Sequence, residues 1–457
     1  MSGWRERAGN MLHALRGRRE ADARMRWSRD QLAAWQHHRL GELVRWASAR
    51  SPFYRDLYGG AIDRDVEPSE LPVVTKPAMM DAFDRVVTDP RLALAPLLEH
   101  LERVRGDDLY LGEHRVMTSS GSSGRKAVFV YDRAAWRAVM TGNLRMSRLT
   151  GLAPRLPRPR LATVAAPDGK HMTFRGGASM DVGLFRARRF SAAAPLPELC
   201  AGLDAYRPTF ILGYPTTLAL LAEEQLAGRL HLAPRTIITS SEVCTERMAD
   251  VIRTAWNVTP FNCLGLTELG ITAVDCSRHE GLHLFEDLAL VEVIDDDGRP
   301  VPDGSPGAKL LVTNLGNRVQ PIIRFEVSDL VTVTSAPCPC GITFRRIVAL
   351  DGRSDDVLTL AGPRGPVRVH PIHLRGALAQ HPAVLQYQIT QTPDGLDVQV
   401  VLARTAAPDA AADVTDRLTR ALHAQGAAVA VRVRPVAAIP REAGAGKLKL
   451  VRGLPAG

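Results

Sequence analysis

The chain is poor in lysine, in aromatic side chains and in long apolar runs. Of its 457 residues only six are lysine, against 52 arginines, and 5% are aromatic. We interpret the excess of arginine, with the abundant Ala and Pro, as GC-rich coding and not as phosphate recognition. No apolar run approaches the roughly 20 residues that cross a bilayer. Arg and Glu interrupt the N-terminus, where a secretory segment would need apolar residues. A cytoplasmic protein with no membrane partner is expected.

Cysteine is also scarce. Six cysteines in a long cytosolic chain indicate free thiols or metal ligands and not disulfides. The 45% hydrophobic and 23% charged content is ordinary for a soluble globular protein. This composition excludes a disordered chain, a collagen-like chain and a disulfide-stapled miniprotein. The length exceeds what one hydrophobic core supports, so two or more domains are expected.

The net charge of +9 is concentrated at the N-terminus. Residues 1–55 hold twelve arginines, five acids and four of the six tryptophans, which leaves the rest of the chain close to neutral. A nucleic-acid partner requires a basic face, so none is expected. We expect residues 1–50 to form a helical leader that serves packing, a homodimer contact or a partner protein.

Short apolar runs separated by Gly, Ser and Pro dominate the middle of the chain. They predict buried strands at 128–131, 161–164, 210–212, 236–239 and 310–313, with helices at 216–228 and 244–256. Strand–helix alternation predicts the α/β class, here as a large N-terminal domain with mixed or parallel sheets.

A smaller α+β unit is expected after residue 350. Its predicted helices cover 372–380 and 411–424, and its strands cover 384–390, 396–403 and 428–433. The predicted organisation is a leader at 1–50, a large domain at 51–351 and a small domain at 352–457.

A loop rich in hydroxyls and glycines carries the strongest local signal. It ends at Lys126, directly before a predicted strand, and it lacks the Gly-Lys-Ser/Thr helix start of a P-loop. Its hydroxyls, main-chain N–H groups and lysine can surround a polyphosphate. A flexible linker is the alternative. The candidate phosphate ligands are Ser119, Ser120, Gly121, Ser122, Ser123, Gly124 and Lys126.

Three other segments carry weaker signals, each with an ordinary structural alternative. Thr267 and Glu268 follow a glycine turn and suit a phosphate and its Mg²⁺, or form an incidental capping pair. Asp329 follows an apolar strand and could accept ribose hydroxyls, or could be an exposed turn residue. Lys447 follows a glycine-rich run and could reach a reacting phosphate, or belong to a solvated tail.

The order and spacing of these motifs over about 330 residues resemble the adenylate-forming superfamily of acyl-coenzyme A synthetases and adenylation domains. Within it, residues 40–450 resemble the phenylacetate–coenzyme A ligase branch. The branch-like segments are 51–55, 71–72, 75–76, 281–283, 286–287 and 338–341. The resemblance implies a large adenylation domain with an ATP and acid site, and a small lid domain that rotates over it.

The resemblance also implies an AMP-forming ligase. A carboxylic acid, aromatic or otherwise planar, would attack the α-phosphate of Mg·ATP and expel pyrophosphate. The acyl-adenylate would then pass its acyl group to the thiol of coenzyme A. The alternatives are an amine or other small nucleophile as acceptor, an unusual oxyacid as substrate, and a degenerate nucleotide-binding scaffold.

Residue roles follow from the resemblance by matching position. The loop 119–124 and Lys126 would hold the β- and γ-phosphates. The other nucleotide-binding residues would be Ser241 and Glu242 at the adenine, Gly265 and Thr267 at the adenylate, Glu268 at Mg²⁺, and Asp329 with Arg353 at the ribose.

Three further roles concern the lid and the acid. Asp355 would be the hinge of lid rotation. Lys447 would stabilise the charge that develops on the α-phosphate, with Lys449 as the alternative. Tyr214 and Leu264 would mark the acid pocket.

Three positions depart from the family pattern. Leu264 replaces a tyrosine expected on adenine, and Glu326 stands where an arginine is usual. Segment 365–371 lacks the expected glycine of the pantetheine tunnel. The sequence therefore supports the first half-reaction better than the second, and it leaves the acceptor open between coenzyme A and an amine.

Cys338-Pro339-Cys340-Gly341 places two thiolates on one predicted turn. Together with an upstream Cys and His they would form a closed, four-ligand structural Zn²⁺ site. The resemblance favours Cys276, His283, Cys338 and Cys340, with His279 as the rival nitrogen ligand. Free cysteines are the alternative, and this is the expectation for Cys200, Cys244 and Cys263.

Overall fold

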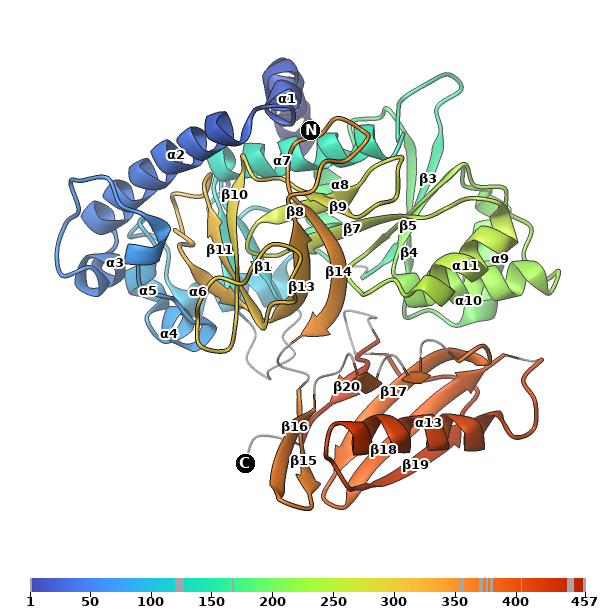
Figure 1. Ribbon diagram of the computed structural model, residues 1–457. Helices are drawn as coiled ribbons and strands as arrows, with labels where there is room; N and C mark the ends of the chain where they lie inside the picture. Colours follow the sequence, from blue (N-terminus) through green and yellow to red (C-terminus); the bar gives the residue numbers. More distant parts are fainter. Residues whose placement is uncertain are drawn as a thin grey trace. The chain divides into compact units, whose positions relative to one another are not determined.

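The chain forms two compact units, each described here by itself. Unit 1 comprises Met1–Pro159, Asp168–Ala187 and Phe261–Ala349, and unit 2 comprises Arg160–Pro167, Arg188–Pro260 and Leu350–Gly457. The computed structural model (Figure 1) describes residues 2–119, 127–166, 168–353, 357–369, 373–374, 377–378, 381–403, 405–441 and 448–454. Within these ranges no helix is both long and apolar enough to cross a membrane.

Two helices form the leader in unit 1, namely α1 (Ser2–Arg24) and α2 (Arg29–Arg50). Ser28 begins α2 through a capping box, because its Oγ accepts from the Gln31 N–H at 3.2 Å and Gln31 Oε1 accepts from the Ser28 N–H at 3.0 Å. Helix α1 packs against α7 (Arg133–Leu149) and α8 (Met172–Met180) (Figure 1). Short helices follow the leader: α3 (Pro52–Leu57), η1 (Pro68–Glu70), α4 (Lys76–Asp81), α5 (Phe83–Val86) and α6 (Leu94–Arg103).

Two adjacent buried acids anchor the leader. Glu286 and Asp287 are only 1% and 2% exposed. The Glu286 carboxylate pairs with Arg29 of the leader at 2.8 Å and with Arg345 at 2.7 Å. Trp35 Nε1 donates to the main-chain oxygen of Asp287 at 2.9 Å. Part of the leader's positive charge therefore serves packing within unit 1.

The strands of unit 1 form antiparallel arrangements. Strands β1 (Arg115–Thr118) and β2 (Val128–Tyr131) pair as a hairpin. A second group runs β10 (Ala289–Ile294), β11 (Lys309–Asn314) and β12 (Phe325–Val327). Strand β13 (Asp329–Thr334) follows β12 in the sequence but belongs to the third group. A third joins β7 (Phe261–Leu266), β8 (Gly270–Asp275), β9 (Leu282–Leu284) and the start of β14 (Arg346–Arg353).

Unit 2 contains a parallel sheet with buried strands. Strands β3 (Arg160–Ala165), β5 (Phe210–Gly213) and β6 (Thr236–Ser240) pair in parallel, as their largely apolar sequences predict. Side chains of α9 (Leu196–Tyr206), α10 (Pro215–Leu226) and α11 (Glu246–Trp256) share one apolar core with this sheet. Strand β4 is Arg186–Ser191.

The C-terminal part of unit 2 is an α+β arrangement. Its sheet runs β19 (Ala430–Pro435), β18 (Gly395–Leu402), β17 (Val384–Thr392) and β20 (Val451–Arg452), and α13 (Ala410–Ala424) covers one face (Figure 1). Strands β15 (Leu358–Gly362) and β16 (Gly365–Val369) form a separate hairpin. The predicted helix at 372–380 lies mostly outside the described residues. The predicted fold class is confirmed.

Candidate functional site

The predicted phosphate loop connects the two strands of the β1–β2 hairpin. Ser119 closes it at one end, because its N–H donates to the Ala127 oxygen at 2.9 Å and its Oγ accepts from the Ala127 N–H at 3.1 Å. The predicted ligands from Ser120 to Gly124, and Lys126, lie outside the described residues. The hairpin thus fixes where the loop leaves and re-enters the fold.

The Thr267–Glu268 turn joins β7 to β8. Tyr131 Oη donates to the Thr267 main-chain oxygen at 2.6 Å, and Asn314 Nδ2 donates to the Glu268 main-chain oxygen at 2.8 Å. These two bonds come from other strands and hold the turn through its main chain. That side chain is 8% exposed. Burial raises the pKa of Tyr131 far above its usual range, which keeps this hydroxyl a donor.

Asp329 begins β13 and is 8% exposed, so it is not an exposed turn residue. Arg324, shortly before it, has a φ of 44° and pairs through two nitrogens with Glu292 at 3.0 and 3.2 Å. Glu326 pairs with Lys309 at 3.0 Å across β11 and β12. The acid that departs from the family pattern therefore has a local cation as its partner.

Ser241 and Glu242 follow β6. Ser241 has a φ of 71°, an uncommon left-handed conformation for a residue other than glycine. Such conformations cluster at functional sites. Glu242 Oε2 accepts from the hydroxyl and from the N–H of Thr216, at 2.7 and 3.3 Å. The Glu242 carboxylate thus faces the start of α10, a partner that the sequence did not predict.

The two predicted pocket residues are both buried. Tyr214 is 2% exposed and lies in the core of unit 2, where its Oη accepts from the Ala166 N–H at 3.0 Å. Leu264 is 7% exposed in β7, next to an irregularity in its pairing with β8. Their role at an acid pocket stays a prediction.

Three predicted residues of the lid fall at the limits of the described chain. Asp355 and Lys447 lie outside it. Arg353 is the last residue of β14, and its side chain is not among the described parts. Lys449 is described, and its main-chain oxygen accepts from Gln388 Nε2 at 2.8 Å.

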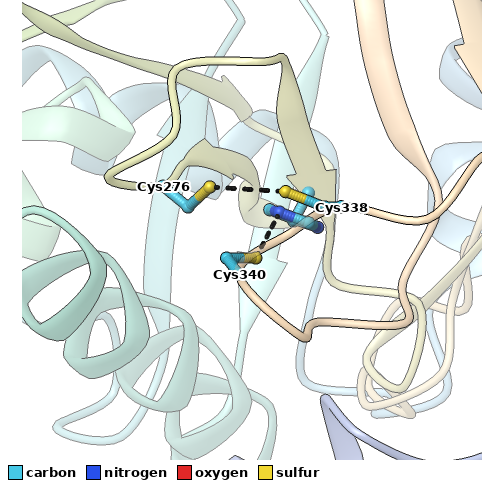
Figure 2. Close-up of side chains that lie close together, drawn as sticks. Cys276, Cys338 and Cys340 are labelled. Atoms are coloured by element: carbon cyan, nitrogen blue, oxygen red, sulfur yellow. Dashed lines mark hydrogen bonds between the residues drawn. The ribbon is translucent and has the colours of Figure 1, made fainter.

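Four residues from two sequence-distant segments of unit 1 come together as a candidate metal site. One ligand atom of each residue lies within 4.8 Å of those of the others, and the residues are Cys276, His283, Cys338 and Cys340. Cys276 Sγ and Cys338 Sγ are 3.8 Å apart, and Cys340 Sγ lies 3.3 Å from His283 Nε2. Figure 2 shows the three sulfurs turned toward one another from two separate segments.

Burial favours the uncharged forms of two ligand groups in this cluster. Burial lowers the pKa of His283 to about 4 and raises that of Cys276 to about 12. The rival ligand His279 instead places Nδ1 2.7 Å from Asp275 Oδ2. None of the six cysteines forms a disulfide.

Comparison with known structures identifies the fold as that of the two-domain acyl-coenzyme A ligases. The chain overlaps 2-hydroxyisobutyryl-coenzyme A ligase in its postadenylation state with a TM-score of 0.70 and 22% identity, over 92% of this chain and 88% of that one. Anthranilate coenzyme A ligase overlaps with a TM-score of 0.53 and 18% identity, over 72% of this chain and 64% of that one. No family model matches the chain.

Curated phenylacetate–coenzyme A ligases are similar to the chain over most of its length. The chain is 26% identical over 385 residues to phenylacetate–coenzyme A ligase of Thermus thermophilus, which covers 80% of each protein. It is 27% identical over 365 residues to phenylacetate–coenzyme A ligase of Escherichia coli, which covers 76% of this chain and 75% of the relative. The resemblance deduced from the motifs is confirmed.

Proposed function

We propose that this chain is an AMP-forming ligase that activates a carboxylic acid as its acyl-adenylate and transfers the acyl group to coenzyme A. The likeness to phenylacetate–coenzyme A ligases over 80% of both chains carries this proposal. That likeness also favours an aromatic acid as the substrate. The three predicted parts, 1–50, 51–351 and 352–457, would act as leader, adenylation domain and lid.

In the first half-reaction an acid oxygen bonds to the α-phosphorus of ATP while the bond to the bridging oxygen of pyrophosphate breaks. The β1–β2 loop with Lys126 would hold the leaving phosphates, and Asp329 with Arg353 would hold the ribose. Lys447 would stabilise the charge that develops on the α-phosphate. The buried carboxylates of Glu268 and Asp329 support these assignments, since oxygen ligands placed in a fixed fold suit a nucleotide and its cation.

Magnesium would be held by Glu268 next to Thr267. The turn that carries Glu268 is held through its main-chain oxygens, which accept bonds from Tyr131 and Asn314. A divalent cation supplies charge neutralisation for the phosphates.

In the second half-reaction the coenzyme A sulfur bonds to the acyl carbonyl carbon and AMP leaves with the electrons of the broken C–O bond. Rotation of the lid about Asp355 would bring this nucleophile in. Coenzyme A is the acceptor named for the relatives, and an amine is the alternative left by the altered 365–371 segment.

The cysteine–histidine cluster would hold a structural Zn²⁺. Ligands about 2.3 Å from a tetrahedral zinc place two sulfurs roughly 3.8 Å apart, and the Cys276–Cys338 distance is 3.8 Å. Four protein ligands leave no open position, so this metal would stabilise the fold and take no part in catalysis.

A pyrophosphate-release screen over aromatic acids, with and without coenzyme A, tests the proposal. We expect acid-dependent release, and coenzyme A-dependent AMP formation with the same acid. AMP formation with an amine but not with coenzyme A would favour the alternative acceptor. Folded, zinc-loaded protein that releases no pyrophosphate with any acid of a broad panel would contradict the ligase assignment.

A further inference from the structure

The Glu242 carboxylate joins two segments of unit 2 that are far apart in the sequence. Its Oε2 accepts from the Thr216 hydroxyl at 2.7 Å and from the Thr216 N–H at 3.3 Å. Its Oε1 accepts from the Leu448 N–H at 2.9 Å. Leu448 directly follows Lys447 in the sequence. One side chain thus holds both the start of α10 and the segment that begins after the proposed catalytic lysine.

The Thr216 end of this contact is built into the helix. Helix α10 has Tyr214 as its N-cap residue and no side-chain cap of its own. The first N–H groups of a helix lack partners within it, and a carboxylate there is favoured by the helix dipole. Glu242 supplies this cap from another segment, to a residue that is 1% exposed. The contact with buried Thr216 therefore fixes the position of the Glu242 carboxylate.

The Leu448 end is fixed from the opposite side as well. Gln388 Nε2 donates to the Lys449 oxygen at 2.8 Å, and the Ile389 N–H donates to the Leu450 oxygen at 2.8 Å. Strand β20 continues this pairing in parallel with β17. The segment from Leu448 onward is thus held between the β17 strand and Glu242.

Two further bonds join the same segments at Thr216. Arg441 Nη1 donates to Thr216 Oγ1 at 3.3 Å, while that hydroxyl donates its own proton to Glu242. Gln386 Nε2 of β17 donates to the Thr216 main-chain oxygen at 3.2 Å. Donors from both sides of the 442–447 segment therefore converge on the Glu242–Thr216 pair.

We propose that Glu242 is a positioning residue for adenylate formation, which holds the chain at Leu448, directly after Lys447 in the sequence. This rests on the proposed function, and it replaces the expectation that Glu242 lines the adenine site. A lysine must be held close to the α-phosphate in one arrangement to stabilise the charge that develops there. The Glu242 carboxylate is the described acceptor for the Leu448 N–H, the first main-chain donor after this lysine.

The test compares Glu242→Ala with Glu246→Ala in full-length protein. Glu246 is an exposed acid four residues further on, in the first turn of α11. We expect Glu242→Ala to lower kcat for pyrophosphate release at least tenfold, with KM for ATP and the Kd for AMP within twofold of wild type. Glu246→Ala is expected to leave all three unchanged. Glu242→Gln keeps one acceptor oxygen and should fall between wild type and Glu242→Ala.

Amide hydrogen exchange provides a readout that does not depend on activity. Peptides covering 448–452 should exchange at least tenfold faster in Glu242→Ala and at the wild-type rate in Glu246→Ala. Unchanged exchange, or AMP binding weakened in proportion to kcat, would overturn the positioning role, the latter in favour of the adenine site. Wild-type protein without pyrophosphate release would instead refute the proposed ligase function, whatever the exchange result.

Discussion

Arg145 and Asp287 form a buried two-point ion pair. The distances are 2.6 Å from Nη1 to Oδ1 and 2.7 Å from Nη2 to Oδ2, and the side chains are 2% and 0% exposed. The second Arg145 nitrogen also donates to the main-chain oxygen of Ala21 in the leader. The pair therefore connects α7 with the segment just before β10 and with the leader.

Loss of one partner of this pair should be costly. Asp287→Ala leaves the Arg145 guanidinium buried without its counter-ion, and we expect a loss of about 3–5 kcal/mol in the free energy of unfolding. Urea titration measures it. Asp250→Ala removes one partner of the exposed Arg253–Asp250 pair and should cost less than about 1 kcal/mol. Equal losses in the free energy of unfolding of the two variants would show that the buried pair stabilises the fold no more than the exposed pair does.

Stability should also depend on pH through Glu286. Burial alone would raise its pKa, but Arg345 and Arg29 outweigh burial and hold the pKa below the usual 4.5. A carboxyl whose pKa is lower in the folded state stabilises the fold above pH 4.5, and this contribution is lost as pH falls through the folded-state value.

Glu286→Gln removes that linkage. At pH 7 we expect a loss of about 1–3 kcal/mol, since hydrogen bonds to a charged acceptor are lost. The gap between variant and wild type should narrow as the pH falls below 4.5, measured by urea titration at each pH. If the difference in the free energy of unfolding between variant and wild type stayed constant down to pH 3, ionisation of Glu286 would contribute nothing to stability.

The proposed zinc site at the cysteine–histidine cluster predicts one zinc ion per chain. Cys338→Ser should lose the metal and lower the melting temperature, because metal binding contributes to folding free energy. Elemental analysis of the purified protein measures the content. Cys200→Ser changes a buried thiol outside the cluster and should keep the zinc. Wild-type protein that is free of zinc after purification and does not take it up would refute the site.

The two lysines near the C-terminus should differ in their effect. Lys447→Ala is expected to slow pyrophosphate release about 100-fold or more, because it removes a charge that acts in the transition state. ATP binding should change little. Lys449→Ala serves as the matched control, and a larger loss in that variant would reverse the assignment between the two.

Local sequence patterns predicted much of the fold because apolar runs and turn residues determine buried strands and their ends. The parallel strands β3, β5 and β6 follow from continuous apolar segments. The pair Cys338 and Cys340 on one turn likewise predicted a candidate metal site. The structure places Cys276, 62 residues before Cys338, next to this pair.

Contacts between distant polar residues could not be predicted in this way. Glu242 lies 26 residues from Thr216 and 206 from Leu448, and no periodicity joins the three. Proline at the first position of α10 was the available signal, since it marks a helix start whose N–H groups need outside partners. The arginine partners of Glu286 and Asp287 could not be predicted from the sequence either, because they lie up to 257 residues away.

The docking of the leader determines what intrinsic fluorescence would report for this protein. Four of the six tryptophans belong to residues 1–55. Trp35 lies under the Arg24 guanidinium at 4.4 Å and donates to Asp287, and Trp46 donates to the Arg318 main-chain oxygen at 3.1 Å. A shift in tryptophan emission on heating or in denaturant would thus first signal that the leader has detached, and a separate probe would be needed to follow the remaining domains.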